Sequence, residues 1–170
     1  LRVHIPAKFN IIMDNLNLIG LDAAKAAGLA NGLNELLANY HVFYQNVRGF
    51  HWNISGDKFF ELHVKFEELY NNLVIKIDEV AERIVTLGYP PIHSFTGYLK
   101  NSVIKEETNI TEGRTCVRLI VESMQTLLEI EREILHLSAD LDDEGTNALV
   151  SDYIREQEKL VWMYSSFLNK

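Results

Sequence analysis

The chain has 170 residues, enough for one domain with a sizeable hydrophobic core. With 47% apolar residues, 24% charged residues and three prolines, the composition predicts a soluble, helical protein, and the net charge of −8 disfavours general nucleic-acid binding. No apolar run is long enough to cross a bilayer and no secretion signal is recognisable, so we expect neither a membrane nor a secreted protein. The lone Cys116 excludes an intrachain disulfide framework and favours a reducing cytoplasm.

Residues 1–14 are expected to form an N-terminal extension, because Met13 followed by DNLNLIGLD could serve as a natural start. Residues 15–170 are expected to form a single domain. Its first long helix is predicted over residues 22–55, where apolar side chains recur at the spacing of one helix face. These side chains are Leu29, Leu33, Leu36, Leu37, Tyr40, Phe43, Tyr44, Val47 and Phe50.

A second long helix is predicted over residues 57–87. The preceding residues, 53–56, are typical of a turn, with Gly56 at a left-handed cap and Asp57 placed to start the next helix. Gly88, Pro90 and Pro91 end the second helix. Its inward stripe consists of Phe59, Leu62, Phe66, Leu69, Tyr70, Leu73, Ile77, Val80, Ala81 and Ile84.

A connection of about twenty residues follows, and within it SFTGYLK is expected to form a short helix on the central pair. A third helix is predicted over residues 111–138, and a turn over residues 140–145 precedes a fourth. Four long helices with one long crossover between the second and the third predict an all-α, ferritin-like four-helix bundle. Glu133 and His136 have the Glu-x-x-His spacing of di-iron bundle sites, but no second copy exists, so we expect both on the surface.

Two pairs of potential metal ligands lie in the second helix. His63 precedes Glu67 by four residues, and Asp78 precedes Glu82 by four, so each pair lies on one helix face. The pairs lie within about 60° of the same face but roughly 22 Å apart along the axis. One helix therefore cannot close both pairs on a single ion.

His51 supplies a second imidazole, because a chain reversal at Gly56 should bring it beside His63. If a second copy of the helix runs antiparallel across a two-fold axis, Asp78 and Glu82 of one chain meet the histidines of the other, and two shared sites form per dimer. Polar residues in an otherwise apolar stripe are costly when unpaired, which favours metal binding over chance polarity. Imidazole and carboxylate ligands without thiolate suit iron(II), with manganese or zinc as competitors, and anionic oxygen ligands favour oxidation to iron(III).

Two segments carry a family resemblance: HWNISGDKFFELHVKFE and IDEVAERIVTLGYPP resemble the two signatures of the Dps family, the mini-ferritins named for DNA-binding proteins from starved cells. The resemblance runs over about residues 15–167. It implies an iron-oxidising site between two subunits, with His51, His63, Asp78 and Glu82 as ligands. Where the family often has a further Asp, this chain has Glu67, and ligation either directly or through water stays open.

The resemblance also implies a shell of twelve subunits that oxidises Fe(II) with hydrogen peroxide, or more slowly with dioxygen, and mineralises Fe(III) in its cavity. Asp143, Glu144 and Asp152 are candidates for the three-fold pores through which iron enters, although acids at a helix start are ordinarily caps. Trp52, next to His51, is a candidate acceptor of stray oxidising equivalents, with a buried packing role as the alternative.

DNA binding is not expected despite the family's name. Members that bind DNA often use a lysine-rich tail, whereas residues 1–25 carry only Arg2, Lys8 and Lys25 against Asp14 and Asp22. Two alternatives stay open: a DNA-condensing stress protein, which a gel shift would reveal, and a structural bundle with an inactive or zinc-filled site, which an iron-oxidation assay would reveal.

Overall fold

The computed structural model describes residues 16–169, so the expected extension at residues 1–14 lies outside the described part of the chain. Within that part, the predicted all-α bundle with a short helix in the crossover is confirmed. The limits of the helices lie within about two residues of the predicted ones. The helices are α2 (Ala23–Asn53), α3 (Phe59–Thr86), α4 (Phe95–Asn101), α5 (Gly113–Ala139) and α6 (Glu144–Leu168).

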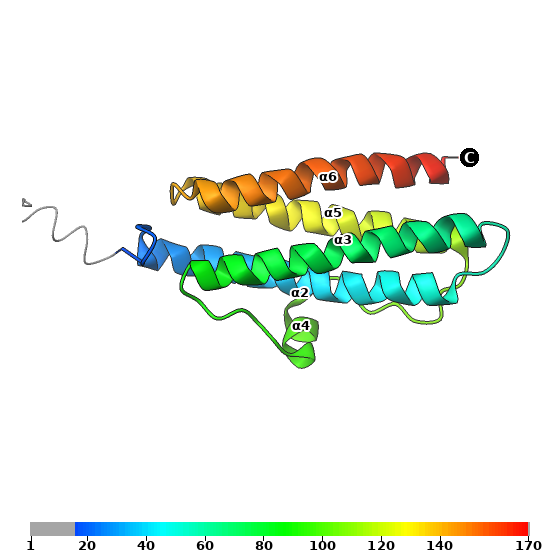
Figure 1. Cartoon of the computed structure of the whole chain (residues 1–170), viewed down its shortest axis with the longest axis horizontal. Coiled ribbons are helices and arrows are strands. Elements are labelled where there is room, and N and C mark those ends of the chain that lie inside the picture. The colour runs from blue at the N-terminus through cyan, green and yellow to red at the C-terminus, as the bar shows by residue number, and fades with distance from the viewer. Residues whose placement is uncertain (1–15, 170) are drawn as a thin grey trace, which may run out of the picture.

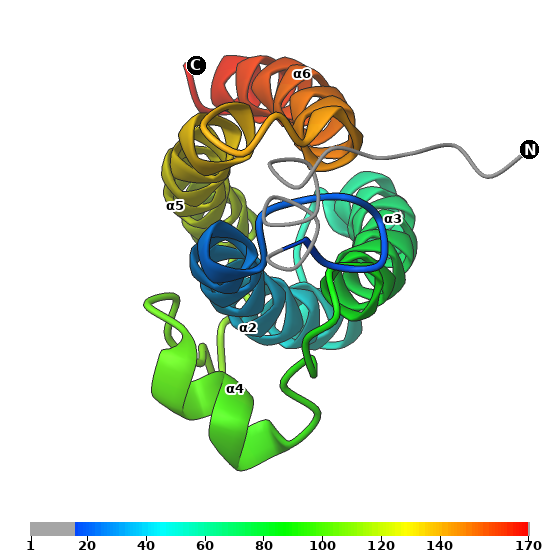
Figure 2. The ribbon, with the colours of Figure 1, turned by 90° about the vertical axis from the view of Figure 1, so that its left-hand side faces the viewer.

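The four long helices enclose one apolar core. Helix α2 packs beside α3 and α5 beside α6, and α2 also packs on α5 (Figure 1). Viewed end on, the four helices surround the core while α4 lies outside, against α2 (Figure 2). The largest fully buried side chains include Phe43, Phe50 and Phe66, and each such burial contributes about 1.5 to 3 kcal/mol. This core gives the helices fixed relative positions. Among the described residues, we find no helix that is both long and apolar enough to cross a membrane.

The turn between α2 and α3 sets the two helices side by side. Gly56 has a φ of 101°, which confirms the predicted left-handed position. The expectation that Asp57 starts α3 is wrong: Lys58 is the N-cap, and it makes no side-chain cap bond because its ammonium group has no acceptor. The Phe59 N–H bonds to the Gly56 carbonyl at 3.2 Å. The Ser55 N–H also donates to the Thr111 carbonyl at 3.0 Å, which ties this turn to the end of the crossover.

Two buried asparagines of α2 hold the crossover against the bundle. The Oδ1 atom of Asn39 accepts from the Ser102 hydroxyl at 3.1 Å and from the Ile104 N–H at 3.0 Å. The Oδ1 atom of Asn46 accepts from the Glu107 N–H at 2.9 Å. These bonds satisfy backbone groups that α4 and its flanks leave unpaired. The long connection is therefore fixed along α2.

Candidate metal centre

His51 and His63 face each other where α2 ends and α3 begins. Their rings are stacked, with centroids 3.8 Å apart and planes inclined by 19°. His51 Nδ1 lies 2.8 Å from the His63 carbonyl oxygen, and His63 Nδ1 lies 2.9 Å from the His51 carbonyl oxygen. The predicted meeting of the two histidines is therefore present, with a reciprocal pair of backbone contacts.

These contacts determine which ring nitrogens can bind a metal. A carbonyl oxygen can only accept, so each Nδ1 must carry a hydrogen and donate it. A neutral ring with its proton on Nδ1 has its lone pair on Nε2, and metal-ligating histidines commonly have this arrangement. His51 is 8% exposed, and Phe59 stacks on His63 with centroids 5.0 Å apart. The pair is thus a rigid, two-nitrogen half of a metal site.

The acidic ligand candidates lie elsewhere on α3. Glu67, Asp78 and Glu82 are exposed, and their carboxylates have no hydrogen-bond or ion-pair partner among residues 16–169. Asp78 is fifteen residues beyond His63, which corresponds to roughly 22 Å along the helix. Figure 1 shows the start of α3 at the end of the bundle where α2 finishes, and its last turn at the other end. Within the described residues, no three His, Cys, Asp or Glu side chains come together to hold a metal ion.

Comparisons with known proteins place this chain in a family. The ferritin-like domain matches residues 30–170. A crystal structure of a Dps protein from Vibrio cholerae O1 matches with a TM-score of 0.90 and 57% identity, covering 91% of this chain and 98% of that chain. The chain belongs to the Dps family. Its relatives include a DNA protection during starvation protein of Porphyromonas gingivalis, 41% identical over 91% of this chain and 98% of that protein. An uncharacterized protein of Haemophilus influenzae is 55% identical over 87% of this chain and 92% of that protein.

The family membership confirms the resemblance read from the two signatures and the ferritin-like fold. The Vibrio cholerae protein is described as a member of a broad superfamily of ferritin-like diiron-carboxylate proteins. The histidine and carboxylate donors of this Dps chain fit iron, because they combine imidazole nitrogen with anionic oxygen and include no thiolate.

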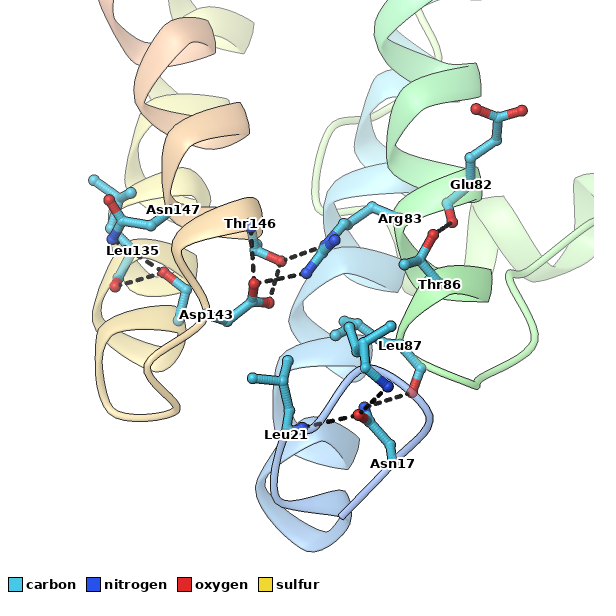
Figure 3. A network of polar contacts seen from close by, with 12 residues as sticks. Asn17, Leu21, Glu82, Arg83, Thr86, Leu87, Leu135, Asp143, Thr146 and Asn147 are labelled. Carbon is cyan, nitrogen blue, oxygen red and sulfur yellow. Dashed lines mark hydrogen bonds and ion pairs between the residues drawn. The ribbon is translucent and has the colours of Figure 1, made fainter. Parts of the chain in front are cut away.

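Arg83, next to Glu82, binds the start of α6 (Figure 3). Its Nη2 donates to Asp143 Oδ1 at 2.6 Å, and its Nε donates to Thr146 Oγ1 at 2.8 Å. Asp143 is 4% exposed and also accepts from the Thr146 N–H as the N-cap of α6. Arg83 therefore pairs with the N-cap acid of α6 and not with Glu82. The carboxylate of Asp143 serves as a helix cap in this chain, which is the alternative weighed against a pore role.

Asp143→Ala is expected to lower the free energy of unfolding by about 2 kcal/mol, because α6 loses its cap and Arg83 loses its partner. Thermal unfolding measures this loss. Burial alone would raise the pKa of Asp143, but the hydrogen bonds from Arg83 and Thr146 outweigh it and lower that pKa. The stabilisation is therefore full at neutral pH, and it is lost as the pH falls below the unfolded value of about 3.9. Asp140→Ala, at an exposed position before the same turn, is the control; an equal loss there would contradict the cap role.

The remaining candidates lie on the surface of the single chain. Trp52 is 57% exposed in the single chain, and the Arg48 guanidinium lies 4.6 Å from its ring centroid, so Trp52 is not buried within one subunit. Glu144 is exposed, and so is Asp152, whose carboxylate pairs with Arg155 at 2.8 Å. Glu133 and His136 are exposed, as expected for residues outside the site.

A buried polar cluster in the middle of the bundle was missed by the sequence analysis. Glu131 of α5 is fully buried, and its Oε1 accepts from the Tyr40 hydroxyl at 2.6 Å and from the Gln157 amide. On α3, Lys76 is 4% exposed and pairs with Glu156. The only signal in the sequence was an acid at a core position, four residues after Leu127 and three before Ile134.

Burial raises the pKa of Glu131 to about 7, although Tyr40, Gln157, Lys76 and Arg132 each act to lower it. A raised pKa means that the folded chain binds this proton more tightly than the unfolded chain. Stability should therefore fall by up to about 3 kcal/mol as the pH rises from about 4.3 to neutrality. Glu131→Gln should flatten that part of the stability profile, measured by thermal unfolding at several pH values. An unchanged pH profile in Glu131→Gln would show that Glu131 is not responsible.

Proposed function

We propose that this Dps protein is a ferroxidase and iron store. It oxidises Fe(II) with hydrogen peroxide, or more slowly with dioxygen, at sites shared between two subunits of a twelve-subunit shell. One observation carries the proposal: the reciprocal His51 and His63 contacts leave Nε2 of each ring as the ligating atom, while Asp78 and Glu82 have no partner among residues 16–169 and lie far along α3. Each half needs the other half from a neighbouring chain.

The roles of the residues follow from their chemistry. The two imidazoles bind Fe(II) terminally, and their Nδ1–H bonds to backbone keep them in a fixed orientation. Asp78 and Glu82 of the partner supply negative charge, with Glu82 placed to bridge two irons and Glu67 adding a carboxylate directly or through water. Negative ligands favour Fe(III) over Fe(II) because the attraction grows with the charge of the ion. Two Fe(II) then give two electrons to hydrogen peroxide, which takes up two protons and leaves as two waters.

Two further features support transport and storage of iron. The net charge of −8 suits a protein that gathers cations. Glu144 and Asp152 are exposed near the start of α6, where a ring of carboxylates around a three-fold axis would attract Fe(II). We place the protein in the cytoplasm, which fits the free thiol of the buried Cys116, whose pKa burial raises to about 11. Residues 1–14 stay outside the ferritin-like domain in this proposal.

Zinc and manganese are expected to compete for the site, because both accept imidazole and carboxylate ligands. A zinc-filled or inactive site would make the protein a structural bundle. Stopped-flow mixing of Fe(II)-loaded protein with hydrogen peroxide separates these functions: rapid oxidation supports the ferroxidase, and an inert protein removes the catalytic proposal.

DNA condensation is the other candidate function, since several relatives are named for protecting DNA. The net charge of −8 does not favour it, because binding to the phosphate backbone depends on clustered lysine and arginine. We expect no gel shift of duplex DNA at moderate salt. A shift that weakens steeply as salt is raised would establish DNA binding by another surface.

A further inference from the structure

Tyr40 is a fully buried phenol that donates to a fully buried carboxylate. Both Tyr40 and Glu131 are 0% exposed, and the hydroxyl lies 2.6 Å from Glu131 Oε1. A phenol that loses an electron also gives up its proton, so its oxidation is easiest when a proton acceptor is already in contact. This pair has such an acceptor inside the core.

The cluster around Glu131 is short of hydrogen-bond donors. Gln157 Nε2 donates to Glu131 Oε1 and lies 3.0 Å from the Tyr40 hydroxyl. Among the described residues, Glu131 Oε2 and Gln157 Oε1 have no partner. Each orphaned buried acceptor costs about 1 to 3 kcal/mol. A proton that arrives on Glu131 converts an acceptor into a donor, so the cluster is arranged to receive one.

Aromatic rings connect this cluster to the histidine pair. The His51 ring meets the Tyr70 ring edge-on with centroids 5.3 Å apart, and Tyr70 meets Tyr44 edge-on at 6.2 Å. Tyr44 is one helical turn from Tyr40 on α2, which puts their Cβ atoms about 6 Å apart. The path from Tyr40 to the metal end of the chain thus consists of one step along a single helical turn, from Tyr40 to Tyr44, and two steps between rings in contact.

The rings along this path differ from Tyr40 in charge environment. The Arg48 guanidinium lies 5.3 Å from the Tyr44 centroid, 6.0 Å from that of Tyr70 and 4.6 Å from that of Trp52. A positive neighbour disfavours a radical cation on any of these rings. Tyr40 forms a neutral radical instead, because its proton moves to Glu131. An oxidising equivalent should therefore settle on Tyr40.

We propose that Tyr40 is a redox-active residue that donates one electron to hydrogen peroxide at a site holding a single iron, while Glu131 takes its proton. The proposal rests on the proposed ferroxidase function. Peroxide takes one electron from Fe(II) and one from Tyr40, and its O–O bond breaks. With two protons from solvent it leaves as two waters. Fe(III), a neutral tyrosyl radical and protonated Glu131 remain.

A second Fe(II) restores the starting state. It gives one electron to the radical, Glu131 returns the proton to Tyr40, and a second Fe(III) is formed. The sum is two Fe(II) oxidised for each peroxide, with no hydroxyl radical released between the two events. Tyr40 thus allows a site with one iron to complete a two-electron reduction.

The test is freeze-quench electron paramagnetic resonance of shells that hold about one Fe(II) per shared site and are mixed with hydrogen peroxide. Wild type should give a tyrosyl signal. Tyr40→Phe should lose it, and so should Tyr70→Phe, which interrupts the path, and Glu131→Gln, which removes the proton acceptor. Tyr98→Phe is the matched control, because Tyr98 of α4 stacks on His41 of α2, outside the path. This variant should keep the full signal.

An undiminished signal in Tyr40→Phe, or wild type that oxidises iron without any tyrosyl signal, would overturn the proposal. Should Tyr40→Phe fail to assemble, Tyr70→Phe and Glu131→Gln decide the question. A second readout uses no iron: azide radicals made by pulse radiolysis oxidise the iron-free shell, and the resulting tyrosyl absorbance should persist in wild type and be lost in Tyr40→Phe. If wild type oxidises no iron, the ferroxidase proposal fails, but the iron-free readout still tests Tyr40. Loss of the absorbance in Tyr40→Phe supports a redox-active Tyr40, and equal absorbance in both proteins overturns that role.

Discussion

Replacing His63 by alanine is expected to slow the initial oxidation of Fe(II) by hydrogen peroxide about 100-fold or more, with the shell intact. The substitution removes one Nε2 ligand. It leaves the backbone carbonyl of residue 63 in place, so the Nδ1–H of His51 keeps its acceptor and the remaining imidazole keeps its orientation. Stopped-flow absorbance measures the rate, and light scattering checks the assembly.

His93→Ala is the matched control for this prediction. His93 is exposed in the crossover, and within the described part of the chain its Nδ1 contacts only the nearby Pro91 carbonyl, at 3.0 Å. The same chemical change there should leave the rate unchanged. If His63→Ala is as fast as wild type, or His93→Ala is as slow as His63→Ala, the histidine pair is not the site of oxidation.

Glu82→Ala is expected to reduce the rate as strongly as His63→Ala, because it removes the partner's main anionic ligand. Figure 3 shows the Glu82 carboxylate directed away from the Arg83–Asp143 network, so the melting temperature should stay the same. The double variant His63→Ala/Glu82→Ala should be about as slow as either single variant, since residues that act as a unit have non-additive effects.

Glu133→Ala supplies the comparison for Glu82→Ala, since Glu133 is an exposed acid with the Glu-x-x-His spacing of a di-iron motif. It should retain the wild-type rate. Effects of His63→Ala and Glu82→Ala that multiply in the double variant would indicate two independent sites instead of one.

The helices could be predicted from the sequence because the apolar stripes of α2 and α3 keep strict helical spacing, and because Gly56 and Gly88 mark their ends. The meeting of His51 with His63 followed from the same reversal at Gly56. These features depend on residues close together in the chain. The resemblance to the family rests on two segments that contain all five candidate ligands, so the same residues that indicate the family also indicate the candidate site.

The rest depends on contacts between distant helices. Tyr40, Glu131 and Gln157 come from three helices, and no spacing in the sequence brings them together. The reciprocal backbone contacts of the histidines depend on how α2 and α3 pack, and the capping role of Asp143 was fixed by Arg83, sixty residues earlier. The orientation of Trp52 likewise depends on Arg48 and on its position at a helix end.

The shared site is tested most directly by mixing two inactive variants. One variant carries His51→Ala and His63→Ala and keeps both acids. The other carries Asp78→Ala and Glu82→Ala and keeps both histidines. Shells of the two are dissociated, combined in equal amounts and reassembled, and the rate of Fe(II) oxidation is then measured.

About half of the two-fold pairs in the mixture contain one chain of each kind, and each such pair has one complete site of two. The rate should therefore return to about a quarter of the wild-type value, although each variant alone is inactive. Reassembled shells that contain both chains and stay as inactive as either variant would contradict a site built from two subunits.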